Sequence, residues 1–152
     1  MVLIFVLNLA AAIGAFGLGY LQDRIGHKQA LGLTLIGWTL TCILAALTTS
    51  KGMFWYAAAL AGLCMGSSQS AGRAMAGMLA PPKQVGEFFG LWTFATRLAS
   101  IIGPLSYGAI TWATGGNQRI SIASTTVLFV LGFVVLQRID MTRGRRVTTT
   151  HE

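Results

Sequence analysis

Three charged residues with complementary chemistry lie close together near the start of the sequence. Asp23, Arg24 and Lys28 follow an apolar run, and Gly19 and Gly26 flank them. A carboxylate can approach the positive end of a helix, and the two cations can pair with carboxylates elsewhere. Gly19 should let the preceding helix approach a neighbour, and Gly26 should permit a tight turn. This cluster is predicted to latch helices together. A plain basic loop at a membrane surface would explain the cations alone, without the Asp or the glycine spacing.

A second group of polar residues interrupts apolar sequence. Arg97 lies about ten residues into an apolar run, where an Arg costs roughly 2.5–3.5 kcal/mol on insertion into a membrane. It is therefore predicted to face a helix bundle or a water-filled cavity, and snorkelling to the surface is the alternative. Gln69 and Arg73 share a helical face with Gly62 and Gly66. They are further candidates for a solute path. Interhelical hydrogen bonding by Gln69 and surface anchoring by Arg73 remain open.

Catalysis and metal binding find little support in the residue types. Cys42 and Cys64 lie inside apolar runs and are expected to be small core residues. His27 and His151 lie outside those runs and far apart, and no Cys, His or carboxylate cluster has ligand spacing. No enzyme activity, metal or cofactor is expected.

The composition defines the class of protein that must position these residues. The chain has 152 residues, of which 54% are hydrophobic and 10% charged, with a mean hydropathy of +0.66. Soluble domains carry about 25% charged residues, so this chain lacks the polar surface they need. The formal net charge of +7 comes without a basic patch interleaved with exposed aromatics, so nucleic acid is not an expected partner. The expected partner is a lipid bilayer.

Five charge-poor runs are each near the roughly 20 residues that a helix needs to cross hydrocarbon. The predicted transmembrane helices are Leu3–Leu21, Ala30–Thr49, Met53–Gly72, Phe88–Ala113 and Ile120–Gln137. Only the fourth contains an ionised residue, Arg97, and none shows the strict alternation of membrane strands. The first run lacks a basic leading segment and is too long and Gly-rich for a cleaved leader. The fold class is therefore all-α and polytopic.

The distribution of basic residues predicts the orientation. The connection from Gln22 to Gln29, the connection carrying Arg73, Lys83 and Glu87, and the C-terminal tail should share one side. Eight basic residues lie on that side and two, Lys51 and Arg119, on the other. By the positive-inside rule the C-terminus is cytoplasmic and Met1 lies opposite. An odd number of crossings without a leading loop suggests a piece of a longer chain.

Small and polar residues form stripes along four of the predicted helices, and such stripes are either packing faces or cavity linings. The stripes are Asn8, Ala12, Ala15 and Gly19; Ala30, Thr34, Gly37, Thr41, Ala45 and Thr48; Ala59, Gly62, Gly66, Gln69 and Arg73; and Gly90, Thr93, Arg97, Ser100, Pro104, Gly108 and Thr111. Gly103-Pro104 should bend the fourth helix, which suits either a moving gate or a bent structural helix. The fifth helix is mostly aliphatic and is expected to face lipid.

The charged turn resembles a known signature. Gly19, Leu21, Asp23, Arg24, Gly26 and Lys28 match G-x-L-x-D-R-x-G-x-[KR], the loop signature of the major facilitator superfamily. The runs Gln69-Ser70-Ala71-Gly72-Arg73, Leu79-Ala80-Pro81, Glu87-Phe88-Phe89-Gly90-Leu91 and Ile102-Gly103-Pro104 resemble its vacuole effluxer-like branch, which contains autophagy-related permeases. The resemblance covers about residues 14 to 138. It implies that the five helices are helices eight to twelve of the fold. Residues 1–138 would then be part of the C-terminal bundle, and residues 139–152 a cytoplasmic basic tail.

The resemblance implies a secondary transporter that moves a small solute, such as an amino acid or another carboxylate, by alternating access. Its expected partner is a missing N-terminal half, and its expected location is the inner membrane of a bacterium. The alternative is a helical membrane scaffold or subunit with no transport of its own. If the charged turn is a latch, Asp23 should lie near residues 86–90, at the start of the fourth helix, and Arg24 should reach Glu87.

Overall fold

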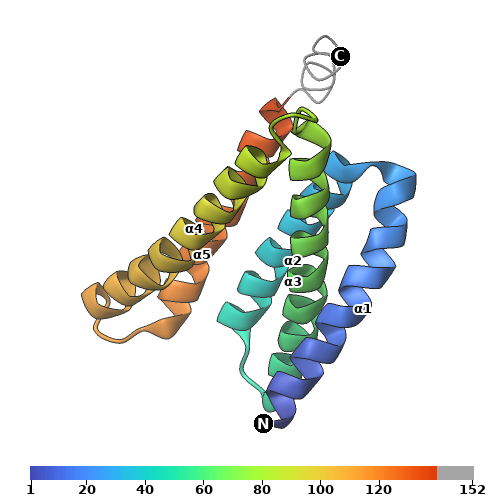
Figure 1. Ribbon diagram of the computed structural model, residues 1–152. Coiled ribbons are helices and arrows are strands. Elements are labelled where there is room, and N and C mark those ends of the chain that lie inside the picture. The colour runs from blue at the N-terminus through green and yellow to red at the C-terminus, as the bar shows by residue number, and fades with distance from the viewer. Residues whose placement is uncertain (140–152) are drawn as a thin grey trace.

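The computed structural model describes residues 1–139, and within that range every regular element is an α-helix (Figure 1). The helices are α1 (Val2–Ile25), α2 (His27–Leu47), α3 (Lys51–Leu79), α4 (Val85–Ala113) and α5 (Gln118–Arg138). The predicted all-α class is confirmed. The predicted basic tail, residues 139–152, lies outside the described residues except for Ile139.

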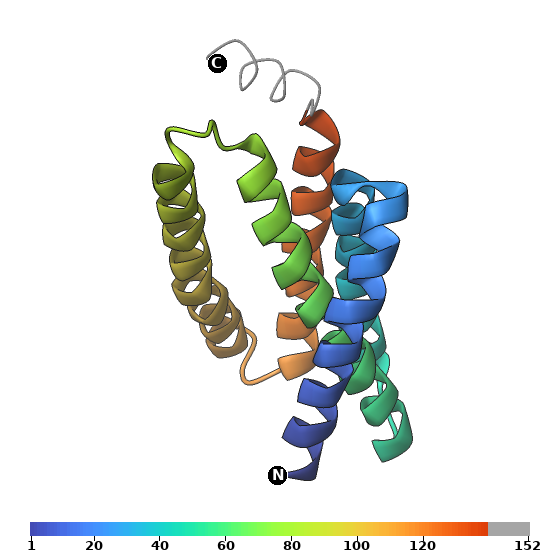
Figure 2. The same cartoon turned by 45° about the vertical axis from the view of Figure 1, so that its right-hand side comes forward.

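The helices run alternately up and down. The α1–α2 turn, the α3–α4 connection and the end of α5 lie at one end of the bundle (Figures 1 and 2). The start of α1 and the α2–α3 and α4–α5 connections lie at the other end. The two basic connections and the end of α5 therefore share one end, as predicted, and this end is called the basic end below.

The helix ends follow from local sequence. Pro81 holds Ala80 in an extended conformation (φ −79°, ψ 124°), which ends α3. The hydroxyl of Ser50 accepts a hydrogen bond from the Met53 amide and caps the start of α3. The Asn117 side chain caps α5 in the same way, by accepting from the Ile120 amide.

The helices extend beyond the apolar runs that predicted them. The predicted third helix ends at Gly72, whereas α3 continues to Leu79, so Arg73 lies inside a helix and not in a connection. The predicted eight-residue connection from Gln22 to Gln29 is also wrong, because Gly26 alone separates α1 from α2. Polar side chains are compatible with a helix, so hydropathy marks the hydrocarbon boundary and not the helix end.

Four of the five helices, α1, α2, α4 and α5, are long and apolar enough to span a membrane. The remaining helix, α3, has 29 residues but is not apolar enough to count as a membrane span on composition. The reason is the polar content of its second half, which contains Ser67, Ser68, Gln69, Ser70 and Arg73. The described residues thus confirm four of the five predicted spans on length and composition.

The bundle centres on α3, which packs closely against both α1 and α2, while α5 packs against α2. Glycines make the α1–α3 contact possible. A Cβ added at Gly66 would lie 1.9 Å from the Ala11 carbonyl oxygen, and one at Gly62 would lie 2.5 Å from that of Leu7. Gly14 fits equally tightly against Leu63. The predicted glycine face of α3 is therefore a helix-packing face.

The interior is built from small residues and the exterior from large ones. Ala30, Thr34 and Thr41 of the predicted α2 stripe are buried, which confirms that stripe as a packing face. Cys42 and Cys64 are buried as predicted. Large apolar side chains instead cover the outside, where Phe16 is 83% exposed and Trp112 87% exposed. This arrangement suits hydrocarbon, which solvates large apolar side chains and favours close approach of small ones.

The helix α4 stands apart from the others. No residue of α4 is buried, and it packs against α5 and, near the basic end, against α3. In both views it lies on the opposite side of the molecule from α1 (Figures 1 and 2). Pro104 lies within α4, which is continuous from Val85 to Ala113. The bend predicted at Gly103-Pro104, in the half of α4 far from the basic end, stays a prediction.

Candidate functional site

Two of the predicted path residues line one cavity. A cavity of about 420 Å³ lies between α1 and α3 and is lined by Ala15, Gly66, Gln69, Ser70 and Arg73. Gln69 and Arg73 are four residues apart, so they lie on the same side of α3 one turn from each other. The cavity therefore combines an amide, a hydroxyl and a guanidinium with a wall of small residues.

The two helices diverge toward the basic end, which makes room for this cavity. The Gly66 backbone touches α1 at Ala11, but a Cβ added at Gly19, two turns further along α1, would meet no atom within 4 Å. The prediction that Gly19 permits a close helix contact is therefore wrong for this structure. The close approach occurs at Gly14, Gly62 and Gly66 instead.

Arg73 connects this region with α4. Its guanidinium carbon lies 5.5 Å from the centroid of the Trp92 ring, within the range of a cation–π interaction. A Cβ added at the neighbouring Gly72 would lie 3.3 Å from Nε1 of the same ring. The glycine thus lets the indole lie against the α3 backbone, where Arg73 can cover it.

Arg97 lies elsewhere on α4. It is exposed and does not line the cavity of Gln69 and Arg73. Five residues separate it from Trp92, which places it about 140° around the helix from the side that meets α3. Its stripe neighbours Thr93 and Ser100 are exposed, and so is Leu105 on the aliphatic side. Because neither side of α4 is covered at this level, the inward orientation of Arg97 stays a prediction.

The charged turn is tighter than predicted. Asp23 and Arg24 belong to the last turn of α1, and Lys28 to the first turn of α2. Gly26 between them has φ +89°, a conformation that L side chains rarely adopt, which confirms the predicted role of this glycine. Arg24 donates a hydrogen bond of 2.6 Å to the Tyr20 hydroxyl, one turn back on its own helix. Its guanidinium carbon also lies 4.8 Å from the centroid of that ring.

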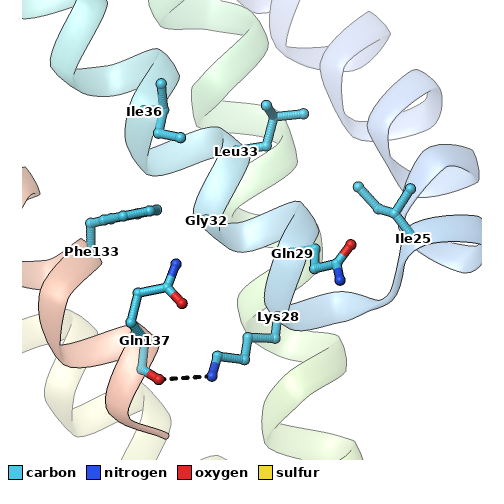
Figure 3. Close-up of a pocket in the computed structure, with 8 residues that line it drawn as sticks. All are labelled: Ile25, Lys28, Gln29, Gly32, Leu33, Ile36, Phe133 and Gln137. Atoms are coloured by element: carbon cyan, nitrogen blue, oxygen red, sulfur yellow. Dashed lines mark hydrogen bonds between the residues drawn. The ribbon is translucent and has the colours of Figure 1, made fainter.

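The turn contacts α5 rather than α4. Nζ of Lys28 donates to the backbone carbonyl of Gln137 at the end of α5 (3.0 Å; Figure 3). It also donates to the backbone carbonyl of Ile139 (2.7 Å). A cation at this position meets the negative end of the helix dipole and the unpaired terminal carbonyls. Sequence analysis missed this contact. One feature of the sequence could have indicated it: Lys28 was predicted to lie at the same end of the bundle as the C-terminus of an apolar helix.

The predicted contact between the turn and α4 is not formed in this structure. In both views the end of α1, which carries Asp23 and Arg24, lies on the opposite side of the bundle from the start of α4, which carries residues 86–90 (Figures 1 and 2). Within residues 1–139, Arg24 donates to Tyr20 on its own helix and forms no ion pair with Glu87. The physical reason is the packing of the glycine faces, which holds α1 against α3 and away from α4.

Other polar side chains tie the remaining helices together. Trp38 Nε1 donates 3.0 Å to the Ser68 hydroxyl, and its ring stacks on Phe129 at 5.3 Å, which joins α2 to α3 and α5. At the other end of the bundle Arg119 donates to the Thr48 carbonyl. Among residues 1–139, no three His, Cys, Asp or Glu side chains gather closely enough to hold a metal ion.

Long apolar helices, a core of small residues and large apolar side chains outside define a polytopic helical membrane protein. The chain belongs to the family described as vacuole effluxer Atg22 like, whose family model matches residues 1–149. It is similar to an uncharacterized MFS-type transporter, YxiO of Bacillus subtilis, with 29% identity over 90% of this chain and 32% of the relative. It is also similar to autophagy-related protein 22 of Yarrowia lipolytica, with 32% identity over 95% of this chain and 21% of that protein.

The autophagy-related protein 22 of Saccharomyces cerevisiae strain S288c is 26% identical over 95% of the chain and 23% of its own length. The chain thus spans about a third or less of the relatives it matches. No solved structure matches it. These comparisons confirm the family to which the charged turn and the later motifs were assigned.

Proposed function

We propose that the chain is the C-terminal part of a secondary transporter that moves a small solute by alternating access. The observation that carries this proposal is the cavity between α1 and α3, into which Gln69 and Arg73 both come from one helix face. Its volume of about 420 Å³ lies in the range of small-molecule sites. The family and the transporter name of the Bacillus relative support it.

In this proposal α1 to α5 are helices eight to twelve of a major facilitator fold, and α3 is the fifth membrane crossing. The length of α3, 29 residues, equals that of α4. In its polar half Ser67 is buried and Ser68 and Ser70 are partly buried, whereas Gln69 and Arg73 are exposed. Exposed polar side chains on a membrane helix are tolerable where they line a path that other parts of the protein cover.

The basic end is proposed to be cytoplasmic, which places the C-terminus inside the cell and Met1 outside. Arg24, Lys28, Arg73, Lys83 and Arg138 lie toward this end, whereas Lys51 and Arg119 lie at the other. The positive-inside rule then sets the orientation. A bacterial inner membrane is the proposed location.

The proposed solute is small and bears a carboxylate, such as an amino acid or another carboxylate. Arg73 lines the cavity, and a guanidinium can hold a carboxylate with two parallel hydrogen bonds. Gln69 adds an amide that can orient the remaining polar groups. Arg97 is proposed to face the same path from α4, from the side that other helices cover in the complete protein.

The proposed partner is the N-terminal part of the transporter. The relatives are three to five times longer than the segment they share with this chain, since that segment is 32% of one and 21% of another. In alternating access the solute binds between two halves that rock against each other. The uncovered surface of α4 is where such a half would pack. The turn at Asp23, Arg24 and Lys28 is proposed to hold one state of this motion.

Transport in reconstituted vesicles tests the proposal. The chain is joined to the preceding part of the Bacillus relative, in place of the segment it matches, and is compared with the chain alone. Uptake and efflux of a panel of labelled amino acids and carboxylates are measured. Solute-specific flux by the joined protein and none by the chain alone would support a transporter part. Correct insertion of the joined protein without flux of any panel member, while the intact relative does transport one, would favour the scaffold alternative.

A further inference from the structure

A groove outside the proposed solute path carries a second kind of binding site. It lies between α2 and α5 at the basic end, has a volume of about 510 Å³, and is separate from the cavity between α1 and α3 (Figure 3). We infer that this groove binds an anionic phospholipid of the inner leaflet, with its phosphate at Lys28 and an acyl chain along the apolar wall. The inference does not depend on transport, because it uses neither Gln69, Arg73 nor Arg97.

The groove is polar at one end only. Its polar lining residues, Lys28, Gln29 and Gln137, lie at the basic end. Its apolar lining residues, Leu33, Ile36 and Phe133, lie farther along α2 and α5 from that end. Figure 3 shows the Gln137 amide and the Phe133 ring projecting from α5 toward α2. From Lys28 to Ile36 the groove follows α2 over about 12 Å. A polar head and an apolar chain in one ligand match this gradient. A free anion would match only the polar end of the groove.

Gly32 creates the room for this groove. A Cβ added there would lie 3.4 Å from Cε2 of Phe133, so a larger side chain would fill the space beside the ring. Leu33 and Ile36 are 45% and 52% exposed on the outer surface of α2. The apolar wall therefore opens toward the region that lipid chains occupy.

The lysine retains hydrogen-bonding capacity for a ligand. An ammonium group has three donors, and Lys28 uses two of them on the carbonyls of Gln137 and Ile139. Both carbonyls are neutral, so the positive charge of Lys28 is not cancelled by them. Among the described residues that line the groove, Lys28 is the only charged one, so the lining carries a single positive charge. The local charge is thus complementary to a phosphodiester.

The position of the groove fits the leaflet in which anionic lipids meet positive side chains. It lies at the end of the bundle that collects the basic residues, which is the end proposed to be cytoplasmic. A basic pocket between helices on the cytoplasmic side can hold an acidic headgroup. The two helices that form it, α2 and α5, are both apolar enough to span a membrane.

Native mass spectrometry of the whole chain in detergent tests the inference. Phosphatidylglycerol and phosphatidylcholine with the same acyl chains are titrated separately, and the retained lipid is counted. Wild type should prefer phosphatidylglycerol. Lys28→Gln should weaken phosphatidylglycerol about fivefold and leave phosphatidylcholine unchanged, on the scale of one surface lysine. Lys51→Gln, the matched loss of charge at the opposite end, should change neither.

Three further arms separate this site from its alternatives. Lys28→Arg keeps the charge and should keep the preference, which shows that loss in Lys28→Gln is not simply misfolding. Gly32→Phe fills the groove and should weaken both lipids, while inorganic phosphate should not displace bound phosphatidylglycerol. Equal losses in Lys28→Gln and Lys51→Gln would overturn the inference in favour of nonspecific attraction. Lipid retention unchanged by Gly32→Phe, or a second copy of the chain protecting the groove from cross-linking, would overturn it too.

Discussion

Arg73 covers the indole ring of Trp92, with its guanidinium carbon 5.5 Å from the ring centroid, and so links the cavity-lining helix α3 to α4. Apart from this region near the basic end, α4 packs chiefly against α5. A movement of α4 would therefore displace the partner of Arg73, which lines the proposed solute path.

We predict that Arg73 and Trp92 are energetically coupled. A double-mutant cycle with Arg73→Gln and Trp92→Ala should give about 0.5–1 kcal/mol of coupling, which is typical of an exposed cation–π pair. Thermal unfolding of the purified chain in detergent is the measurement. The matched cycle with Arg97→Gln and Trp92→Ala should give no coupling, because Arg97 lies on another side of α4. Additive effects in the first cycle would contradict the pairing.

A second prediction concerns the glycine contact between α1 and α3. Gly66→Ala should destabilise the chain by about 1–3 kcal/mol, because the added carbon would lie 1.9 Å from the Ala11 carbonyl oxygen and the backbone would have to shift. Gly17→Ala is the matched control, since nothing lies within 4 Å of its added carbon. That substitution should be neutral or stabilise the helix, because Ala favours helices over Gly. The unfolding midpoint should therefore fall in Gly66→Ala and stay the same or rise in Gly17→Ala.

The orientation of the chain is open to cysteine labelling. Ser50→Cys and Thr149→Cys are introduced singly after Cys42 and Cys64 have been replaced by Ala. An impermeant thiol reagent added outside the cell should label position 50 and not position 149, because the basic end is expected to be cytoplasmic. Thr149 lies outside the described residues, so this experiment also tests the predicted basic tail. Labelling of both positions, or of neither, would contradict five crossings.

Arg97 should matter for transport and not for insertion. In the joined protein Arg97→Ala should abolish flux, and Arg97→Lys should restore little of it, because a lysine cannot hold a carboxylate with two parallel hydrogen bonds. Lys83→Ala, in the α3–α4 connection, is the control and should leave flux unchanged. Expression and membrane insertion should be equal in all variants. Normal flux in Arg97→Ala would identify Arg97 as a snorkelling anchor.

Hydropathy and residue spacing predicted the elements well and their neighbours poorly. The five runs, the shared end of the basic connections and the α2 stripe of Ala30, Thr34 and Thr41 could be read from the sequence, because each depends on a local pattern. The partner of each face could not. Gly62 and Gly66 mark a close contact, but only the three-dimensional packing shows that the contact is with α1.

In the candidate site, too, the local patterns could be predicted from the sequence and the packing partners could not. Four-residue spacing brought Gln69 and Arg73 to one side of α3, as predicted, and the structure places a cavity there. The contact of Lys28 with α5 involves residues 109 and 111 positions apart, and its acceptors are backbone carbonyls, which carry no side-chain signature. The expected contact between Asp23 and α4 failed because a free carboxylate and a free helix start do not by themselves specify each other.

The one-residue connection at Gly26 has a consequence for the order of assembly. α1 and α2 diverge from this point with few contacts between them, and α3 packs closely against both. Because synthesis proceeds from the N-terminus, the first two helices are complete before the third, which both of them contact most, has been made. We therefore expect the hairpin of α1 and α2 to close only when α3 enters between its arms and supplies the contacts that both helices lack.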